Sequence, residues 1–156
     1  MKVALVRHGD AEDQSPDLPD KERKLVKKGI KQMRRVGEFL SQSKFFPDKV
    51  ISSPYLRAYQ SADVILDEME LDSTVQTSDQ LLPEADPSIT LQFLSELESS
   101  LVLLVGHNPH LVNLIKLTTG AEVSLKKGGI VIIDLDKETK KGILEILLDQ
   151  KTLKLI

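Results

Sequence analysis

Cysteine and tryptophan are both absent from this chain of 156 residues, and other aromatic side chains are few. Without cysteine the chain has no disulfide framework, no thiolate nucleophile and no metal site built on sulfur ligands. Four Phe and two Tyr are too few to predict a base-stacking platform for single-stranded nucleic acid. The core must therefore consist mainly of Leu, Val and Ile.

An excess of positive charge is also missing. The 21 Lys and Arg residues face 24 Asp and Glu, so the formal net charge is −3. General nucleic-acid binders carry a basic excess, and we therefore expect no nucleic-acid partner. The apolar run at residues 3–6 is far shorter than a signal peptide or a membrane-spanning segment. We accordingly expect a cytoplasmic protein without a membrane partner.

The length and composition match one ordinary globular unit, since domains most often have roughly 100–150 residues. Apolar residues make up 40% of the chain and charged residues 29%. The sequence contains no low-complexity tract, and no repeat beyond a recurring strand-to-helix unit. We expect residues 1–156 to form a single domain.

Short aliphatic runs alternate with longer segments of helical periodicity, which is the pattern of βαβ units. Strands are expected at residues 3–6, 49–52 and 101–105, and helices at 24–43, 54–71, 87–99 and 109–118. Two more strands are expected between residues 130 and 146, around a polar turn at 136–141. Continuous aliphatic runs are typical of strands buried on both faces. We therefore predict an α/β three-layer sandwich, with a mostly parallel central sheet flanked by helices on both faces.

Three of the predicted strands end at polar or basic residues. The three segments are Arg7-His8-Gly9, Ser52-Ser53-Pro54-Tyr55-Leu56-Arg57 and Gly106-His107-Asn108-Pro109. In the last two, Ser53 and Asn108 are placed to cap a helix, with a proline at the first helical position. The carboxyl ends of parallel strands meet at one edge of a sheet, where ligands bind. We therefore expect Arg7, His8, Arg57 and His107 to converge there.

Two arginines and two histidines at helix N-termini favour a phosphate site. Each guanidinium offers a rigid fork of donors that matches phosphate oxygens. Nearby positive charge pushes His8 toward its neutral, nucleophilic form. Gly9 allows a sharp turn and a close approach of the backbone to a ligand.

These three segments resemble the histidine phosphatase superfamily, which has the phosphoglycerate-mutase-like fold. The resemblance covers residues 3 to about 118 and includes Arg57-Ala58 and Gln60-Ser61-Ala62 in the middle segment. It is strongest for the short, SixA-type phosphohistidine phosphatase branch, whose length this chain shares.

The resemblance implies a role for each matching residue. His8 is then the nucleophile that accepts the phosphoryl group, while Arg7 and Arg57 hold its equatorial oxygens. His107 is the second histidine and stabilises the phosphoryl charge. Gly9, Ser52 and Asn108 are further candidates for phosphate binding. The family needs no metal or cofactor.

The general acid is open at this stage. The segment Leu81-Leu82-Pro83-Glu84-Ala85-Asp86 resembles the loop that supplies a carboxylate in larger members. Glu84 is the first candidate, Asp86 the second and Asp10 the third. A phosphohistidine substrate needs an acid less, because a phosphoramidate is already labile.

Position 11 is Ala where mutase-type members commonly have Ser, and the long insertions that enclose sugar phosphates are missing. We therefore expect an open site that accepts phosphohistidine in proteins, and a metal-independent phosphatase that works through a phosphohistidine intermediate. The alternatives are a broad small-molecule phosphomonoesterase acting on small phosphorylated substrates, a non-catalytic phosphate-binding adaptor and, least favoured, a mutase.

Other interpretations of these residues are structural. The two arginines are then ordinary surface ion-pair partners, and His8 satisfies a strand end or binds zinc with His107 and His110. The basic run between Lys21 and Arg35 is the solvated face of a helix, or it steers a phosphorylated partner. Lys126 and Lys127 are expected in a solvated turn. The polar stretch at 10–22 is expected to be a surface loop, and its role as a partial lid is open.

Overall fold

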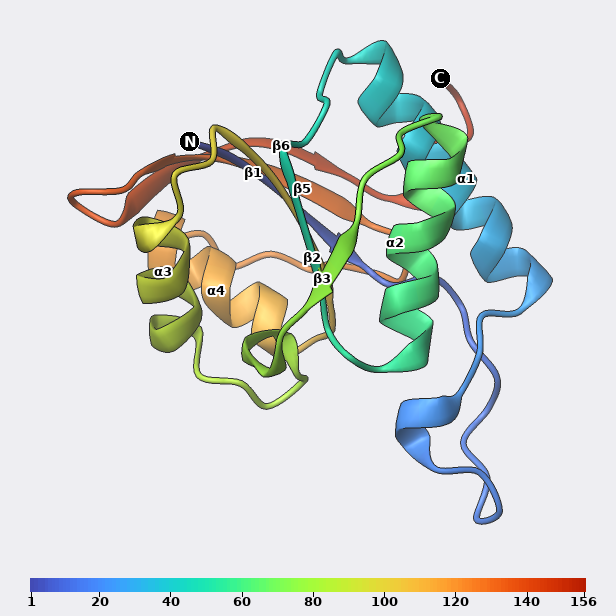
Figure 1. Ribbon diagram of the computed structural model, residues 1–156. Helices are drawn as coiled ribbons and strands as arrows, with labels where there is room; N and C mark the ends of the chain where they lie inside the picture. The colour runs from blue at the N-terminus through green and yellow to red at the C-terminus, as the bar shows by residue number, and fades with distance from the viewer.

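A six-stranded sheet runs through the middle of the computed structural model, which covers residues 1–156 (Figure 1). The strand order is β3-β2-β4-β1-β5-β6. The first four are parallel: β1 (Lys2–Arg7), β2 (Lys49–Ser52), β3 (Val75–Thr77) and β4 (Leu101–Gly106). The antiparallel pair β5 (Ile130–Asp136) and β6 (Lys141–Leu148) extends the sheet beyond β1.

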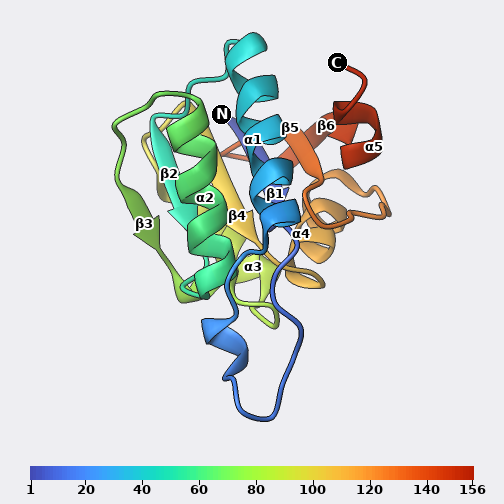
Figure 2. The ribbon, with the colours of Figure 1, turned by 90° about the vertical axis from the view of Figure 1, so that its right-hand side faces the viewer.

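Helices cover both faces of the sheet (Figure 2). One face packs against α1 (Lys27–Gln42), α2 (Leu56–Glu68) and the short α5 (Gln150–Leu153). The other packs against α3 (Pro87–Glu96) and α4 (His110–Thr119). Two 3₁₀ turns, η1 (Asp20–Glu22) and η2 (Asp79–Leu81), complete the elements. No helix combines the length and the apolarity that a membrane span requires.

Alternation along the strands divides the core into two halves. In β1, Ala4 and Val6 belong to the cluster under α1 and α2, whereas Val3 and Leu5 belong to the cluster under α3 and α4. All four side chains are buried, because both faces of a central parallel strand are covered. The predicted three-layer α/β sandwich is confirmed.

Local sequence also sets the helix boundaries. The apolar residues Met33, Val36 and Leu40 recur at helical spacing and are fully buried, which fixes the inward face of α1. Helix α4 ends at Gly120, whose φ of 78° lies in the left-handed region that suits glycine.

The predicted helices exist; three are shorter than expected, α4 is shifted by one residue, and the predicted caps are wrong. Helices α2 and α4 begin at Leu56 and His110, each beyond the proline, and neither has a side-chain cap. The Ser53 hydroxyl accepts instead from the backbone N–H of Tyr55, in a turn before α2. The Asn108–Pro109 peptide bond is cis, and the Asn108 amide donates to another loop. Strand β3 was not predicted, because it has only three residues and two are exposed.

Candidate active site

Strands β1, β2 and β4 end at the same edge of the sheet, and the residues that follow them meet there. The backbone N–H of His8 donates to Gly106 O at 3.1 Å, and that of Ser53 donates to Val105 O at 3.0 Å. The three predicted motifs are thereby held side by side. They border a cavity of about 250 Å³ whose lining includes Arg7, His8, Arg57 and His107.

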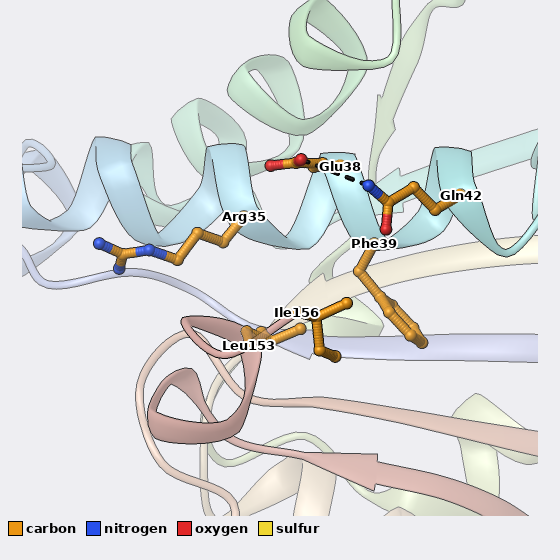
Figure 3. Close-up of a pocket in the computed structure, with 6 residues that line it drawn as sticks. All are labelled: Arg35, Glu38, Phe39, Gln42, Leu153 and Ile156. Atoms are coloured by element: carbon orange, nitrogen blue, oxygen red, sulfur yellow. Dashed lines mark hydrogen bonds between the residues drawn. The ribbon is translucent and has the colours of Figure 1, made fainter.

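The cavity is strongly polar and mostly cationic. Its lining includes four cationic side chains and two carboxylates: Arg7, Arg23, Arg57, Lys127, Asp20 and Glu84. A second hollow, between α1 and the C-terminal residues, has room for only about 10 Å³ (Figure 3). That is roughly the room that one water needs, so this hollow cannot take a phosphorylated group.

His8 is 6% exposed, and its hydrogen bonds define its tautomer. Its Nδ1 lies 2.7 Å from Gly9 O, and a carbonyl oxygen only accepts, so Nδ1 carries the ring proton. Nε2 is then unprotonated and accepts from Arg57 Nε at 3.3 Å. Burial, together with the charges of Arg57 and Arg7, lowers the pKa of His8 to about 4 despite the bond to Gly9 O. His8 is therefore a neutral imidazole with its lone pair on Nε2.

His107 lies beside His8, with 5.0 Å between the ring centroids. Its Nε2 is 2.7 Å from the Ser53 hydroxyl, which also accepts from Tyr55 N–H. Burial and the adjacent positive charges lower the pKa of His107 to about 2. Its Nδ1 is buried without a hydrogen-bond partner.

The two arginines approach the cavity from different elements. Arg57, on the first turn of α2, donates through Nη1 to Asp20 O at 2.7 Å and through Nη2 to Asp20 Oδ2 at 3.2 Å. Its guanidinium carbon lies 5.0 Å from the centre of the Tyr55 ring. Arg7 donates through Nη1 to Leu125 O at 3.1 Å, whereas its buried Nε has no partner.

Glycine is needed at position 9 for a different reason from the one predicted from the sequence. It does not line the cavity, and a Cβ there would lie 2.7 Å from Gly29 O at the start of α1. Its N–H donates to Ser61 Oγ at 3.1 Å, and that hydroxyl donates to Arg57 O at 2.7 Å. Glycine is required here for the close approach of α1 rather than of a ligand.

The structure does not bring Ser52 to the cavity. Its buried hydroxyl donates to Ser53 O at 2.7 Å, and Ser53 is the serine that contacts His107. Asn108 does line the cavity and donates to Leu125 O at 2.8 Å, while its buried Oδ1 has no partner.

Of the three candidate acids, only Glu84 lines the cavity. Asp86 caps α3 by accepting from Ser88 N–H at 2.9 Å. Asp10 accepts from the Gln32 side chain at 2.7 Å and lies 3.7 Å from Lys28 and 3.6 Å from Lys127.

His110 is buried away from the cavity, with its Nε2 2.7 Å from Thr90 Oγ1. No group of three or more His, Asp or Glu side chains is arranged to hold a metal ion.

Sequence reasoning missed four residues of the site: Ser53, Asp20, Arg23 and Lys127. Lys127 was expected in a solvated turn, but it lines the cavity because the 125–129 loop bonds to the end of β1. Gly128 N–H donates to Arg7 O at 3.0 Å, and Arg7 N–H donates to Gly129 O at 3.1 Å. The spacing of Asp20 and Arg23, at i and i+3, was the one available signal for that pair.

Residues 3–84 match the family model of the histidine phosphatase superfamily, branch 1, which is more than half of the chain. The chain belongs to the histidine phosphatase superfamily. It is accordingly a phosphatase, and the motifs that suggested this family are the ones that border the cavity.

Relatives agree in sequence and in fold. The phosphohistidine phosphatase SixA of Escherichia coli K12 is 30% identical over 112 residues, 70% of this chain and 68% of that protein. An uncharacterised protein of Picosynechococcus is 32% identical over 138 residues, 84% of this chain and 83% of that one. The structure of SixA complexed with tungstate superposes with a TM-score of 0.90 at 25% identity, covering 98% of this chain and 99% of that one.

The fold extends to other phosphatases. The α-ribazole phosphatase from Shigella flexneri has a TM-score of 0.77 at 18% identity, over 96% of this chain and 97% of that one. That likeness concerns the fold alone. Together the comparisons make the chain a SixA-like phosphatase of this superfamily.

Proposed function

We propose that the chain removes phosphoryl groups from phosphohistidine in proteins, with His8 as the nucleophile. The observation that carries this proposal is the tautomer of His8. The bond from Nδ1 to Gly9 O leaves Nε2 unprotonated, and Arg57 lies next to that nitrogen. An imidazole held in this way is ready to attack phosphorus.

The reaction proceeds in two displacements. First, His8 Nε2 forms a bond to phosphorus while the bond to the substrate's imidazole nitrogen breaks; the electron pair stays on the leaving imidazole, which takes up a proton. Second, a water oxygen bonds to phosphorus, the P–Nε2 bond breaks, and its electron pair returns to His8. The water loses a proton, which balances the proton taken up before, and inorganic phosphate leaves.

Arg7, Arg57 and His107 stabilise the phosphoryl oxygens during both steps. All three residues line the cavity, so their polar side chains border the space that a phosphoryl group would occupy. Asn108 joins them as a phosphate-binding residue. Fixed donors of this kind stabilise the charge that spreads over the transferred group.

Glu84 is the proposed proton carrier. It supplies the proton to the leaving group and takes one from the attacking water, since it is the one candidate acid at the cavity. For a phosphohistidine substrate this help is small, because imidazole is readily protonated in water.

A protein substrate is favoured by the charge around the cavity. The first turns of α1 carry the exposed residues Lys27, Lys28 and Lys31 and no acid. Cations at a helix N-terminus oppose the helix dipole, so the dipole does not explain them, although Lys28 also pairs with Asp10 at 3.7 Å. Lys127 continues the basic surface to the cavity rim. An acidic phosphoprotein complements this surface, and a phosphohistidine phosphatase is among the relatives.

A substrate panel tests the proposal. Wild type and His8→Ala are given a phosphohistidine-bearing carrier protein, an aryl phosphate, sugar phosphates and nucleotides, and phosphate release is measured. We expect the highest kcat/KM on the carrier protein and none with His8→Ala. Faster turnover of a small phosphate identifies a small-molecule phosphatase instead. Tight binding of the carrier protein without phosphate release identifies an adaptor.

A further inference from the structure

Asp20, in the turn η1, occupies the donors of Arg57 that a phosphoryl group would use. Both terminal nitrogens of the guanidinium donate to this one residue, Nη1 to its backbone oxygen and Nη2 to its carboxylate. Arg57 is 5% exposed and the Asp20 side chain 45% exposed. A carboxylate reached from solvent therefore covers a buried arginine of the phosphate site.

The second oxygen of the same carboxylate belongs to another arginine. Arg23 Nε lies 2.8 Å from Asp20 Oδ1, and Arg23 also donates to Glu12 O at 2.7 Å. Asp20, Arg23 and Arg57 all line the cavity. Asp20 thus bridges two arginines, and it remains paired with Arg23 if its contact with Arg57 is broken.

The charges around the cavity explain why Asp20 lies between Arg23 and Arg57. Four cationic side chains around one cavity repel one another, and Asp20 offsets part of that charge. Although burial raises the pKa of Asp20, bonds from Arg23 and Arg57 lower it below its usual value, so the group is an anion at neutral pH. A phosphoryl dianion carries more charge than a carboxylate and has three oxygens for the same donors.

The surrounding loop is anchored, so the Asp20 carboxylate can leave Arg57 Nη2 while the backbone bond from Nη1 to Asp20 O is kept. Its base is fixed by the bridge between Ala11 and Leu25 and by the bond from Leu25 N–H to Gln60 Oε1 at 2.9 Å. Breaking the Asp20–Arg57 contact leaves these bonds intact.

We propose that Asp20 is a positioning residue for turnover: its carboxylate holds Arg57 Nη2 in the free enzyme, gives way there to the phosphoryl group, and returns as inorganic phosphate leaves. This rests on the proposed function only in that the cavity binds phosphoryl groups. Competition by Asp20 weakens phosphate binding, so product does not accumulate on the enzyme. A purely structural role predicts the opposite sign, since loss of a structural contact would loosen the site.

Binding of inorganic phosphate to the full chain, measured by titration calorimetry, tests this inference. Exposed ion pairs are weak, so Asp20→Asn is expected to bind phosphate about three- to tenfold more tightly than wild type. Asp20→Ala should change the affinity in the same direction. The control is Glu22→Gln, which removes a charge from the same turn but outside the cavity lining. Its phosphate affinity should stay within about twofold of the wild-type value. Unchanged or weaker binding by both folded Asp20 variants overturns the proposal.

A double-mutant cycle with Arg23 gives a second, independent result. In Arg23→Gln, Asp20 keeps Arg57 as its one arginine partner and competes more strongly with phosphate. We therefore expect this change to weaken phosphate binding in the wild-type background. In the Asp20→Asn background the same change should weaken binding less, because only one cation of the cavity lining is then lost. An equal loss in both backgrounds contradicts the proposed exchange. Phosphate binding is measured without turnover, so these results stand whatever the substrate panel shows.

Discussion

The Nε of Arg57 lies 3.3 Å from the Nε2 of His8, so the guanidinium donates to the atom that is proposed to attack phosphorus. This bond exists only while Nε2 is unprotonated, and the Arg57 charge helps to keep it so. The same arginine donates to Asp20. Arg57 therefore prepares the nucleophile and marks the position of the phosphoryl oxygens.

The phosphoryl intermediate on His8 is directly testable. Wild type quenched during turnover should carry a phosphoryl group that is labile in acid and stable in base, and His8→Ala should carry none. We expect the variant to lose at least about 10³-fold in kcat, since a nucleophile is not replaced by its neighbours. A base-stable phosphoryl group that persists in His8→Ala would place the intermediate on another residue. The control is His107→Ala, which removes the second histidine and keeps the proposed nucleophile.

The pH dependence of activity follows from the pKa of His8, which is lowered from 6.5 to about 4. The neutral, reactive form persists down to about pH 4, so kcat/KM corrected for substrate ionisation should stay level between pH 7 and 5. An ordinary histidine would lose activity below pH 6.5. A limb near pH 6.5 in the wild type, assigned to His8, would show that the shift is absent.

Stability should depend on pH in the same window. His8, His107 and His110 have pKa values lowered to about 4, 2 and 4, mainly by burial. Between pH 6.5 and 4 the unfolded chain therefore binds more protons than the folded one, and stability falls as the pH falls. Urea unfolding at pH 7 and pH 5 measures this loss. His110→Asn, remote from the cavity, should reduce it, and equal stability at both pH values would argue against neutral buried histidines.

Glu84→Gln should separate substrates by their leaving groups. With an alkyl phosphate, whose leaving oxygen needs a proton, kcat should fall by about 10²- to 10⁴-fold. With phosphohistidine the loss should be only a few-fold. Asp86→Asn is the matched control, because that side chain caps α3 outside the cavity. If both substrates respond equally to Glu84→Gln, its carboxylate does not carry the proton.

Gly9→Ala should lower stability rather than chemistry. The new Cβ would lie 2.7 Å from Gly29 O, and relief of such a clash costs about 1–3 kcal/mol. Thermal unfolding should show a lower Tm. Gly106→Ala, whose Cβ would be no closer than 3.4 Å to any neighbour, should cost much less. Equal shifts in both variants would show that α1 yields easily at Gly29.

The salt dependence of kcat/KM should differ between a protein substrate and small substrates. Added salt screens the basic surface of α1, so kcat/KM for an acidic phosphoprotein should fall more steeply with salt than kcat/KM for an aryl phosphate. The pair Lys27→Gln and Lys31→Gln should lower the phosphoprotein value alone. Lys141→Gln, an exposed lysine at the start of β6, is the control. Equal salt dependence for both substrates would leave this surface without a role in docking.

The sequence predicted the sheet edge, because His8 and His107 each follow an unbroken aliphatic strand and parallel strands end together. The prediction was wrong where a shift of one residue along the chain changes which side chain faces the site. Ser52 is the last residue of β2 and its hydroxyl bonds to Ser53 O, so the functional contact falls to its neighbour Ser53.

Contacts between distant loops were also beyond the sequence. Lys127 reaches the cavity only because β5 pairs antiparallel with β1, and no local pattern announces that pairing. Asp20 lies in a polar loop whose composition indicates exposure, yet its carboxylate and backbone oxygen bond to a buried arginine. Such contacts depend on tertiary structure and not on propensity.

The carbonyl of Leu125 accepts from both Arg7 and Asn108, and so joins the first motif to the third. It belongs to the segment that leads into β5, well after the last proposed catalytic side chain. A chain released from the ribosome at residue 120 would contain every reacting group but lack both this acceptor and the strand that pairs with β1. We therefore expect catalytic competence to appear late in synthesis, and the onset of activity in a series of nascent-chain lengths would report the docking of the C-terminal hairpin.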